Sequence, residues 1–244
     1  MQVLDEIRGA LYIAKKDLKE YYLKPPTVSW GIAFPLVFAF AFTLRGWDKL
    51  WLASGLLTLS LFFGSTSMSA ASIVFERRMK PFERLLLFPI SYFGVAWGKS
   101  LSSFFFGLLS SIPTVTIIQL FLSISSHNPA LLALCIVGSA LQFSSMGVLL
   151  AFAVKDPAQA MTIFNTIRFP MIFLCDVIIP VSKLPKYLSP ISLVMPLTYS
   201  VEAIRYALVG NYDIVPPQIS IPITFISFFA FLYLAEVLIK RSIP

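Results

Sequence analysis

The sequence predicts an all-helical integral membrane protein with six transmembrane helices, and three observations carry that prediction. Apolar residues make up 57% of the 244 residues, charged residues make up only 13%, and the mean hydropathy is +0.82. Soluble domains contain roughly 45–50% apolar residues. The apolar residues gather in long runs, and charged or proline-rich segments separate these runs. We therefore expect one transmembrane domain over residues 25–244.

Residues 1–24 predict an amphipathic helix that lies in the membrane interface. Apolar side chains recur every three or four residues, at Leu4, Ile7, Leu11, Ala14, Leu18 and Tyr22. The other side is mostly polar and includes Lys15, Lys16 and Asp17. A soluble helix packed on a partner is the alternative. Pro25 and Pro26 end this helix and turn the chain.

Six apolar runs are long enough to be spans. We expect them at residues 27–44, 50–75, 92–122, 131–154, 158–179 and 218–239. With six crossings, both termini lie on one side. Thirteen Lys and Arg residues then lie inside, five lie outside, and Arg168 lies within the bilayer. The positive-inside rule therefore places both termini in the cytoplasm.

Polar groups inside two of these spans attract attention. Residues 64–72 of the second span are mostly small, which favours close helix packing over the lining of a polar path. In the fifth span, Asn165 and Arg168 lie at a depth where such side chains face the protein interior or a water-filled path. Arg168 either contacts an anionic group of a substrate or pairs within the bundle, and pairing is slightly favoured. Asp176 lies near the outer end, where we expect it to reach water.

The segment 76–89, here called the coupling segment, lies between two spans and is highly charged. Its ionisable residues include Glu76, Arg77, Arg78, Glu83 and Arg84. A charge at the centre of a bilayer costs about 2.5–3.5 kcal/mol, so we expect the segment to protrude into water. Phe82, Leu85 and Leu86 fall on one side of a short helix, and this apolar side predicts a docking surface. An ordinary basic loop is the alternative.

Residues 180–215 predict short re-entrant helices in the outer leaflet between the fifth and sixth spans. Prolines at positions 180, 185, 190 and 196 break the region too often for one spanning helix, yet it is too apolar for a free loop. Glu202 and Arg205 lie three residues apart on one such helix and can form a salt bridge.

Two ordered motifs in this chain resemble type-2 ABC exporter permeases. The first runs from Glu76 through Glu83-Arg84-Leu85-Leu86 and Pro89 to Gly98-Lys99. The second runs from Pro180 through Leu184-Pro185, Tyr187-Leu188 and Pro196-Leu197-Thr198-Tyr199 to Glu202 and Ile204-Arg205. The chain departs from the family pattern at Pro81-Phe82, where Gly-Thr is usual, and at Cys175-Asp176, where a glycine is common before the proline.

This resemblance implies a permease without catalytic activity of its own. The coupling helix would contact a separate ATPase subunit through residues 76–78 and 82–86, and ATP and Mg would bind to that subunit. Two permease copies would form a homodimer within a four-subunit complex in the cytoplasmic membrane, in contact with lipid. Outer helices bearing Pro196, Tyr199, Glu202 and Arg205 would gate the exit of a drug, lipid, glycolipid or polysaccharide.

Other functions fit the residues less well. The sequence has no catalytic constellation and no nucleotide-binding fold, so we expect neither an enzyme nor a cofactor site. The net charge of +7 comes from clusters between apolar runs, which favours contact with anionic lipid and argues against nucleic acid. An ion-coupled secondary transporter and a non-transporting membrane scaffold remain as alternatives.

Overall fold

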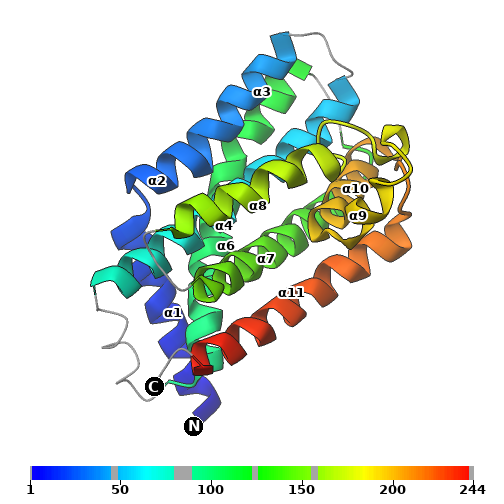
Figure 1. The fold of residues 1–244 in the computed structure, drawn as a ribbon. Helices are drawn as coiled ribbons and strands as arrows, with labels where there is room; N and C mark the ends of the chain where they lie inside the picture. Colours follow the sequence, from blue (N-terminus) through cyan, green and yellow to red (C-terminus); the bar gives the residue numbers. More distant parts are fainter. Residues whose placement is uncertain (1, 45–48, 80–89, 123–125, 155–158, 242–244) are drawn as a thin grey trace.

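The computed structural model describes residues 2–44, 49–79, 90–122, 126–154 and 159–241, and it is helical without strands over these residues (Figure 1). The elements are α1 (Gln2–Tyr21), α2 (Pro25–Val28), the π-helix η1 (Ser29–Ala33), α3 (Phe34–Leu44), α4 (Lys49–Met79), α6 (Tyr92–Ile117), the π-helix η2 (Ile118–Leu122), α7 (Pro129–Ala153), α8 (Ala160–Leu174), the 3₁₀-helix η3 (Val181–Lys183), α9 (Ser189–Val194), α10 (Pro196–Val209) and α11 (Pro217–Arg241).

Four helical stretches in the described part of the chain are long and apolar enough to cross a membrane. They are Lys49–Arg77, Tyr92–Leu120, Pro129–Ala153 and Pro217–Arg241. They overlap the second, third, fourth and sixth predicted spans. The predicted first and fifth spans are represented by shorter apolar stretches, Ser29–Ala41 and Ala160–Leu174. The all-helical prediction is therefore confirmed, whereas the count of six spans stays a prediction.

Both shorter stretches contain features that interrupt a regular α-helix. A π-helix at Ser29–Ala33 separates α2 from α3. Helix α8 contains Pro170 and ends at Leu174, five residues before the predicted boundary. The chain then bends, and Asp176 adopts a positive φ of 65°, which does not continue a right-handed helix.

Helix α4 is the central helix of the bundle. Every residue in an apolar stretch of 18 residues in α4 is buried within the chain. In the corresponding stretch of α11, only 22% of the residues are buried. The small residues of α4 allow close approach to its neighbours, since a Cβ on Gly64 would lie 3.2 Å from the Cα of Gly107 in α6. The hydroxyl of Ser69 donates to that of Ser103 in α6 at 2.7 Å. These contacts support the packing interpretation of residues 64–72.

Gly55 provides a test of this close packing. A Cβ at this position would lie 2.1 Å from the carbonyl oxygen of Val177, which is backbone and cannot rotate away. We expect Gly55→Ala to cost about 1–3 kcal/mol of unfolding free energy because the core becomes overpacked. The measurement is the thermal unfolding midpoint in detergent.

Gly9→Ala is the matched control for Gly55→Ala. A Cβ there would meet the flexible end of the Ile90 side chain at 2.8 Å, which can move. Because alanine also favours the helix, the midpoint should be unchanged or higher. Equal midpoints for the two variants would argue against the close approach at Gly55.

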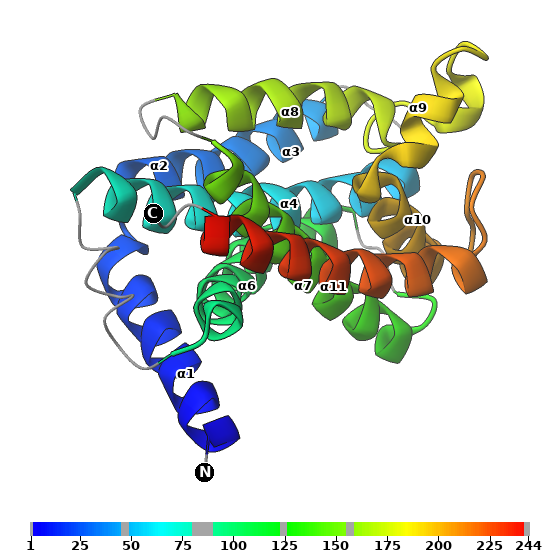
Figure 2. The same cartoon turned by 60° about the horizontal axis from the view of Figure 1, so that its bottom comes forward.

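The two ends of the bundle differ in character. Helix α1, both termini, the C-terminal end of α4 and the N-terminal end of α6 lie at one end, and α9 and α10 lie at the other (Figures 1 and 2). Figure 2 shows α1 projecting from the bundle at an angle. Residues 180–215 contain the short helices η3, α9 and α10, and their re-entrant position in the outer leaflet stays a prediction.

Large apolar side chains are exposed on several helices. Examples are Val37 and Phe40 on α3, Phe173 on α8, and Ile226 and Phe229 on α11. On a chain of this hydropathy, such faces suit contact with lipid or with other membrane-embedded protein.

Candidate functional site

Four charged residues form an inner charge cluster where α1, α4 and α6 meet: Lys16, Asp17, Glu76 and Lys99. The Lys99 ammonium lies 2.9 Å from Asp17 Oδ2 and 2.7 Å from Glu76 Oε2, and all three side chains are buried. Lys16 donates to the other carboxylate oxygen of Glu76 from a partly exposed position. Two ammonium groups thus balance two carboxylates, and the four side chains tie three helices together.

The environment of the α1 residues shifts their titration. Burial raises the pKa of the Asp17 carboxyl above its usual range, and the charge of Lys99 counters part of this rise. For Lys16, burial lowers the pKa, but the hydrogen bond and the charge of Glu76 outweigh burial and leave the pKa above its ordinary value. Lys16 is therefore charged at neutral pH.

The structure corrects two predictions about these residues. Glu76 was expected to protrude into water, and Asp17 was expected on the polar, solvated side of α1; both are buried. Their shared partner Lys99 lies on another helix, distant in the sequence, so the pattern of each local segment does not reveal the ion pairs of Asp17 and Glu76 with Lys99. One feature of the sequence does indicate a buried ion pair: Lys99 lies inside the predicted third span, where an unpaired charge would be costly.

Arg77 also binds within the bundle. Its guanidinium donates to the carbonyl oxygens of Ala151 at 2.8 Å and Val154 at 2.7 Å, at the C-terminal end of α7. Carbonyl groups at a helix end lack partners within the helix, so a cation is stabilising there. Arg77 thus joins the end of α4 to the end of α7.

Most of the coupling segment lies outside the described residues. Helix α4 is described to Met79, and the description resumes at Ile90. The predictions for Phe82, Glu83, Arg84, Leu85 and Leu86, and for the side chain of Arg78, concern parts that the structure does not describe. The described residues that flank the segment lie at the end of the bundle that also carries α1 and the termini (Figure 1).

A second group, the outer charge cluster, lies at the opposite end and consists of Asp176, Glu202, Arg205 and Asp213. Arg205 forms an ion pair with the Asp176 carboxylate and donates to the Asp176 carbonyl at 2.7 Å. Its Nε donates to Ser54 of α4 at 3.1 Å, and its guanidinium lies 3.4 Å from the centre of the Trp51 ring. Arg205 therefore fastens α10 to α4.

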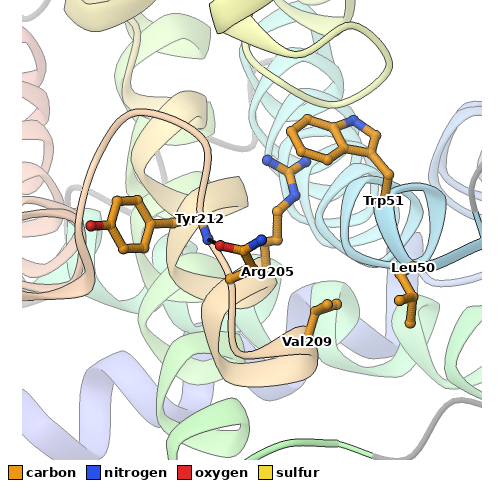
Figure 3. A pocket seen from close by; sticks show the side chains of 6 residues that line it. Leu50, Trp51, Arg205, Val209 and Tyr212 are labelled. Atoms are coloured by element: carbon orange, nitrogen blue, oxygen red, sulfur yellow. Dashed lines mark hydrogen bonds between the residues drawn. The ribbon is translucent and has the colours of Figure 1, made fainter.

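Arg205 and Trp51 line a pocket of about 130 Å³, together with Leu50, Val209, Asn211 and Tyr212. Figure 3 shows the guanidinium of Arg205 extending toward the indole of Trp51, with Tyr212 on the other side of α10. The Arg205 head group already has partners, so this pocket does not present a free charge.

The other carboxylates of the outer charge cluster are engaged as well. Glu202 accepts hydrogen bonds from the backbone N–H groups of Asp213 at 2.9 Å and Ile214 at 2.8 Å. Its predicted salt bridge with Arg205 is confirmed, with a separation of 3.8 Å. Asp176, expected to reach water, is buried against Arg205. Asp176, Glu202 and Asp213 place oxygens within 4.8 Å of one another, and Arg205 supplies the neighbouring positive charge.

The remaining residues predicted for the outer helices have structural contacts. Pro196 is the first residue of α10, and its carbonyl accepts a hydrogen bond from Gln142 of α7 at 3.3 Å. The hydroxyl of Tyr199 donates to the carbonyl of Leu193 in α9 at 2.6 Å. These contacts join α9 and α10 to each other and to α7.

Arg168 differs from the other buried charges. It is 1% exposed and lies between the rings of Phe63 and Phe164, each 5.1 Å from the guanidinium carbon. Its Nε and Nη2 atoms have no hydrogen-bond partner, and no carboxylate in the described part of the chain lies within ion-pair distance. Pairing within the bundle, which the sequence slightly favoured, is not seen among the described residues. Asn165, on the same helix, is half-buried.

Fold and charge distribution define a multi-helix membrane protein whose central helix is tied to its neighbours at both ends. The chain belongs to the ABC-2 type transporter family, whose pattern matches residues 9–209. Members of this family are transmembrane, non-catalytic subunits that normally pair with an ATPase subunit. The predicted resemblance is thus confirmed.

Two relatives carry the name transport permease ycf38. The protein from Porphyra purpurea is 23% identical over 223 residues, which cover 84% of this chain and 74% of the relative. The protein from Cyanophora paradoxa is 26% identical over 162 residues, which cover 62% of this chain and 53% of the relative. Both similarities support a transport permease.

Proposed function

We propose that this chain is the transmembrane permease of an ATP-driven exporter that moves an amphipathic substrate outward across the cytoplasmic membrane. The observation that carries the proposal is the inner charge cluster. It lies at the end of α4 from which the coupling segment continues, and it joins α4 to α1 and α6 through the buried Lys99. A push on the coupling segment would therefore reach three helices together.

The ATPase would be a separate subunit that binds ATP and Mg and contacts residues 76–78 and 82–86. Two copies of this chain and two ATPase subunits would form the complex, with no cofactor on this chain and no role for nucleic acid. Closure of the ATPase pair would tilt α4, and α9 and α10, bearing Pro196, Tyr199, Glu202 and Arg205, would gate the exit. The excess of Lys and Arg on the inner side supports cytoplasmic termini.

The coupling segment is tested in the assembled complex. We expect Leu86→Asp to weaken ATPase binding by about 2 kcal/mol or more, about 30-fold, because a charge replaces an apolar anchor. Glu83→Ala should lower the ATP turnover that the permease stimulates. The readouts are co-purification and ATP hydrolysis with the permease in vesicles.

Glu20→Ala is the matched control for Glu83→Ala, because Glu20 is half-exposed on α1 and lies 4.0 Å from its Lys16 partner. This variant should retain normal turnover. The coupling role would be rejected if Leu86→Asp and Glu83→Ala bound and stimulated the ATPase like the unaltered chain.

A further inference from the structure

Arg168 carries a buried positive charge that no carboxylate in the described part of the chain balances. Lys99 has two carboxylate partners at the inner end, and Arg205 pairs with Asp176 at the outer end. Arg168 has aromatic neighbours, but no described carboxylate pairs with it. A buried charge without a partner is costly, so this position requires a reason beyond packing.

Helix α4 gives the depth of Arg168 in the bundle. Arg205 contacts α4 at Ser54, Arg168 contacts it at Phe63, and Lys99 contacts it at Glu76. At about 1.5 Å per residue, Phe63 lies roughly 14 Å along the axis from Ser54 and roughly 20 Å from Glu76. The unbalanced guanidinium thus lies near the middle of the long central helix, where an ion is most costly without a counter-ion.

The surroundings of Arg168 are aromatic. Phe63 stacks on Phe34 with ring centres 4.6 Å apart, and Phe34 contacts Phe169 at 6.0 Å. Trp30 contacts Phe169 at 6.2 Å, so rings from η1, α3, α4 and α8 form one aromatic cluster beside the guanidinium. This cluster runs from the buried Phe63 through the partly buried Trp30 and Phe34 to the exposed Phe169. Such a cluster suits a hydrocarbon tail, and an arginine fork suits a phosphate or carboxylate.

Helix α8 separates the buried Arg168 from the exposed side of the bundle, so a ligand would reach Arg168 by displacement of this helix or its side chains. Its outer side exposes Phe169 and Phe173, while Arg168 faces inward toward α4. Pro170, two residues beyond Arg168, has no N–H and cannot complete the backbone ladder of α8. The helix that carries the guanidinium is therefore weakened at the level of the guanidinium.

We propose that Arg168 binds the anionic group, a phosphate or carboxylate, of an amphiphile whose apolar part lies against the exposed Phe169 and the partly buried Trp30 and Phe34. This assignment names the substrate class of the proposed exporter. It rests on the proposed function only for the claim that the bound amphiphile is transported outward with energy from ATP. Binding of the amphiphile requires neither ATP nor a partner subunit. A binding assay therefore tests this proposal, whereas the ATPase assay tests the proposed function.

The test measures binding of labelled dodecyl phosphate to the full chain in phosphatidylcholine nanodiscs. Dodecylphosphocholine supplies the same tail and phosphate with an added positive charge, and inorganic phosphate supplies the anion without a tail. We expect saturable binding of dodecyl phosphate, and at least tenfold weaker binding of both other probes. Inorganic phosphate binding as tightly as dodecyl phosphate would overturn the amphiphile assignment.

Two substitutions isolate the charge. Arg168→Gln should weaken dodecyl phosphate binding at least tenfold, and Arg168→Lys should retain part of it. Arg241→Gln, which removes the same charge from an exposed position at the end of α11, should bind like the unaltered chain. Unchanged binding by Arg168→Gln would overturn the proposal.

Stability of the ligand-free chain distinguishes a binding role from a packing role. If Arg168 serves a ligand, Arg168→Met should unfold at the same temperature as the unaltered chain or higher, because it removes an unbalanced buried charge. A midpoint several degrees lower in Arg168→Met, together with unchanged selectivity between the probes in Arg168→Gln, would show a packing role and overturn the proposal.

Discussion

Lys99→Met is expected to lower the unfolding free energy of the chain by about 3–5 kcal/mol, because it leaves the buried carboxylates of Asp17 and Glu76 without their shared cation. The effect should appear as a lower midpoint in thermal unfolding of the purified chain. Lys16→Met is the matched control. Lys16 is partly exposed and is the outer partner of Glu76, so water can replace much of its contribution.

A combined variant separates the charge effect from the packing effect. The variant that combines Asp17→Asn, Glu76→Gln and Lys99→Met leaves no fully buried charge in the cluster, because the remaining Lys16 is partly exposed. Most of the stability lost in Lys99→Met should therefore return. The same large loss in Lys99→Met and in the combined variant would show that the volume and shape of Lys99, rather than its charge, stabilise the junction of α1, α4 and α6.

Asp176→Asn is expected to have the next largest effect, a loss of about 3 kcal/mol, because it removes the ion-pair partner of the buried Arg205. Asparagine tolerates the positive φ of this position and nearly preserves the volume, so the substitution isolates the charge. Thermal unfolding in detergent provides the measurement.

Asp213→Asn provides the comparison for the outer charge cluster. Asp213 is only partly buried and accepts from the backbone N–H of Ser182 at 2.8 Å, a bond that an asparagine oxygen can also accept. Its cost should be well below that of Asp176→Asn. If the two variants unfolded at the same temperature, the ion pair between Arg205 and Asp176 would not be the contact that holds α10 against α4.

The sequence predicted the long helices well, because a run of apolar residues sufficient to cross a bilayer is a local property. Helices α4, α6, α7 and α11 follow the predicted spans to within a few residues at most of their ends. The lengths of the first and fifth predicted spans were harder to predict from the sequence. A π-helix and Pro170 change the local geometry without lowering hydropathy, so a hydropathy argument overlooks them.

The partners of the charged residues were the part that the sequence did not predict. Asp17 and Lys99 are 82 residues apart, and Asp176 and Arg205 are 29 apart. Helical periodicity assigns a residue to a face of its own helix but does not identify the neighbouring helix. Local reasoning therefore placed Glu76 and Asp176 in water and Asp17 on the polar side of its helix. It found the ion pair of Arg205 with Glu202, its neighbour in sequence, but not the ion pair with Asp176.

The family motifs supplied information that periodicity lacked. Glu76 and Lys99 begin and end one motif, and the structure places them 2.7 Å apart. Glu202 and Arg205 end the other motif, and both make contacts that hold α10 at the end of the bundle opposite α1. Arg168 belongs to neither motif, which fits a residue whose role concerns a ligand rather than the shared fold.

The side of the membrane that the coupling segment faces tests the central claim most directly. The test labels the variant Lys80→Cys with a membrane-impermeant maleimide in intact cells and in inside-out vesicles. Cys135 and Cys175 are buried, so the unaltered chain reports the background. The account predicts labelling only in inside-out vesicles, where an ATPase subunit would bind; labelling in intact cells would contradict it.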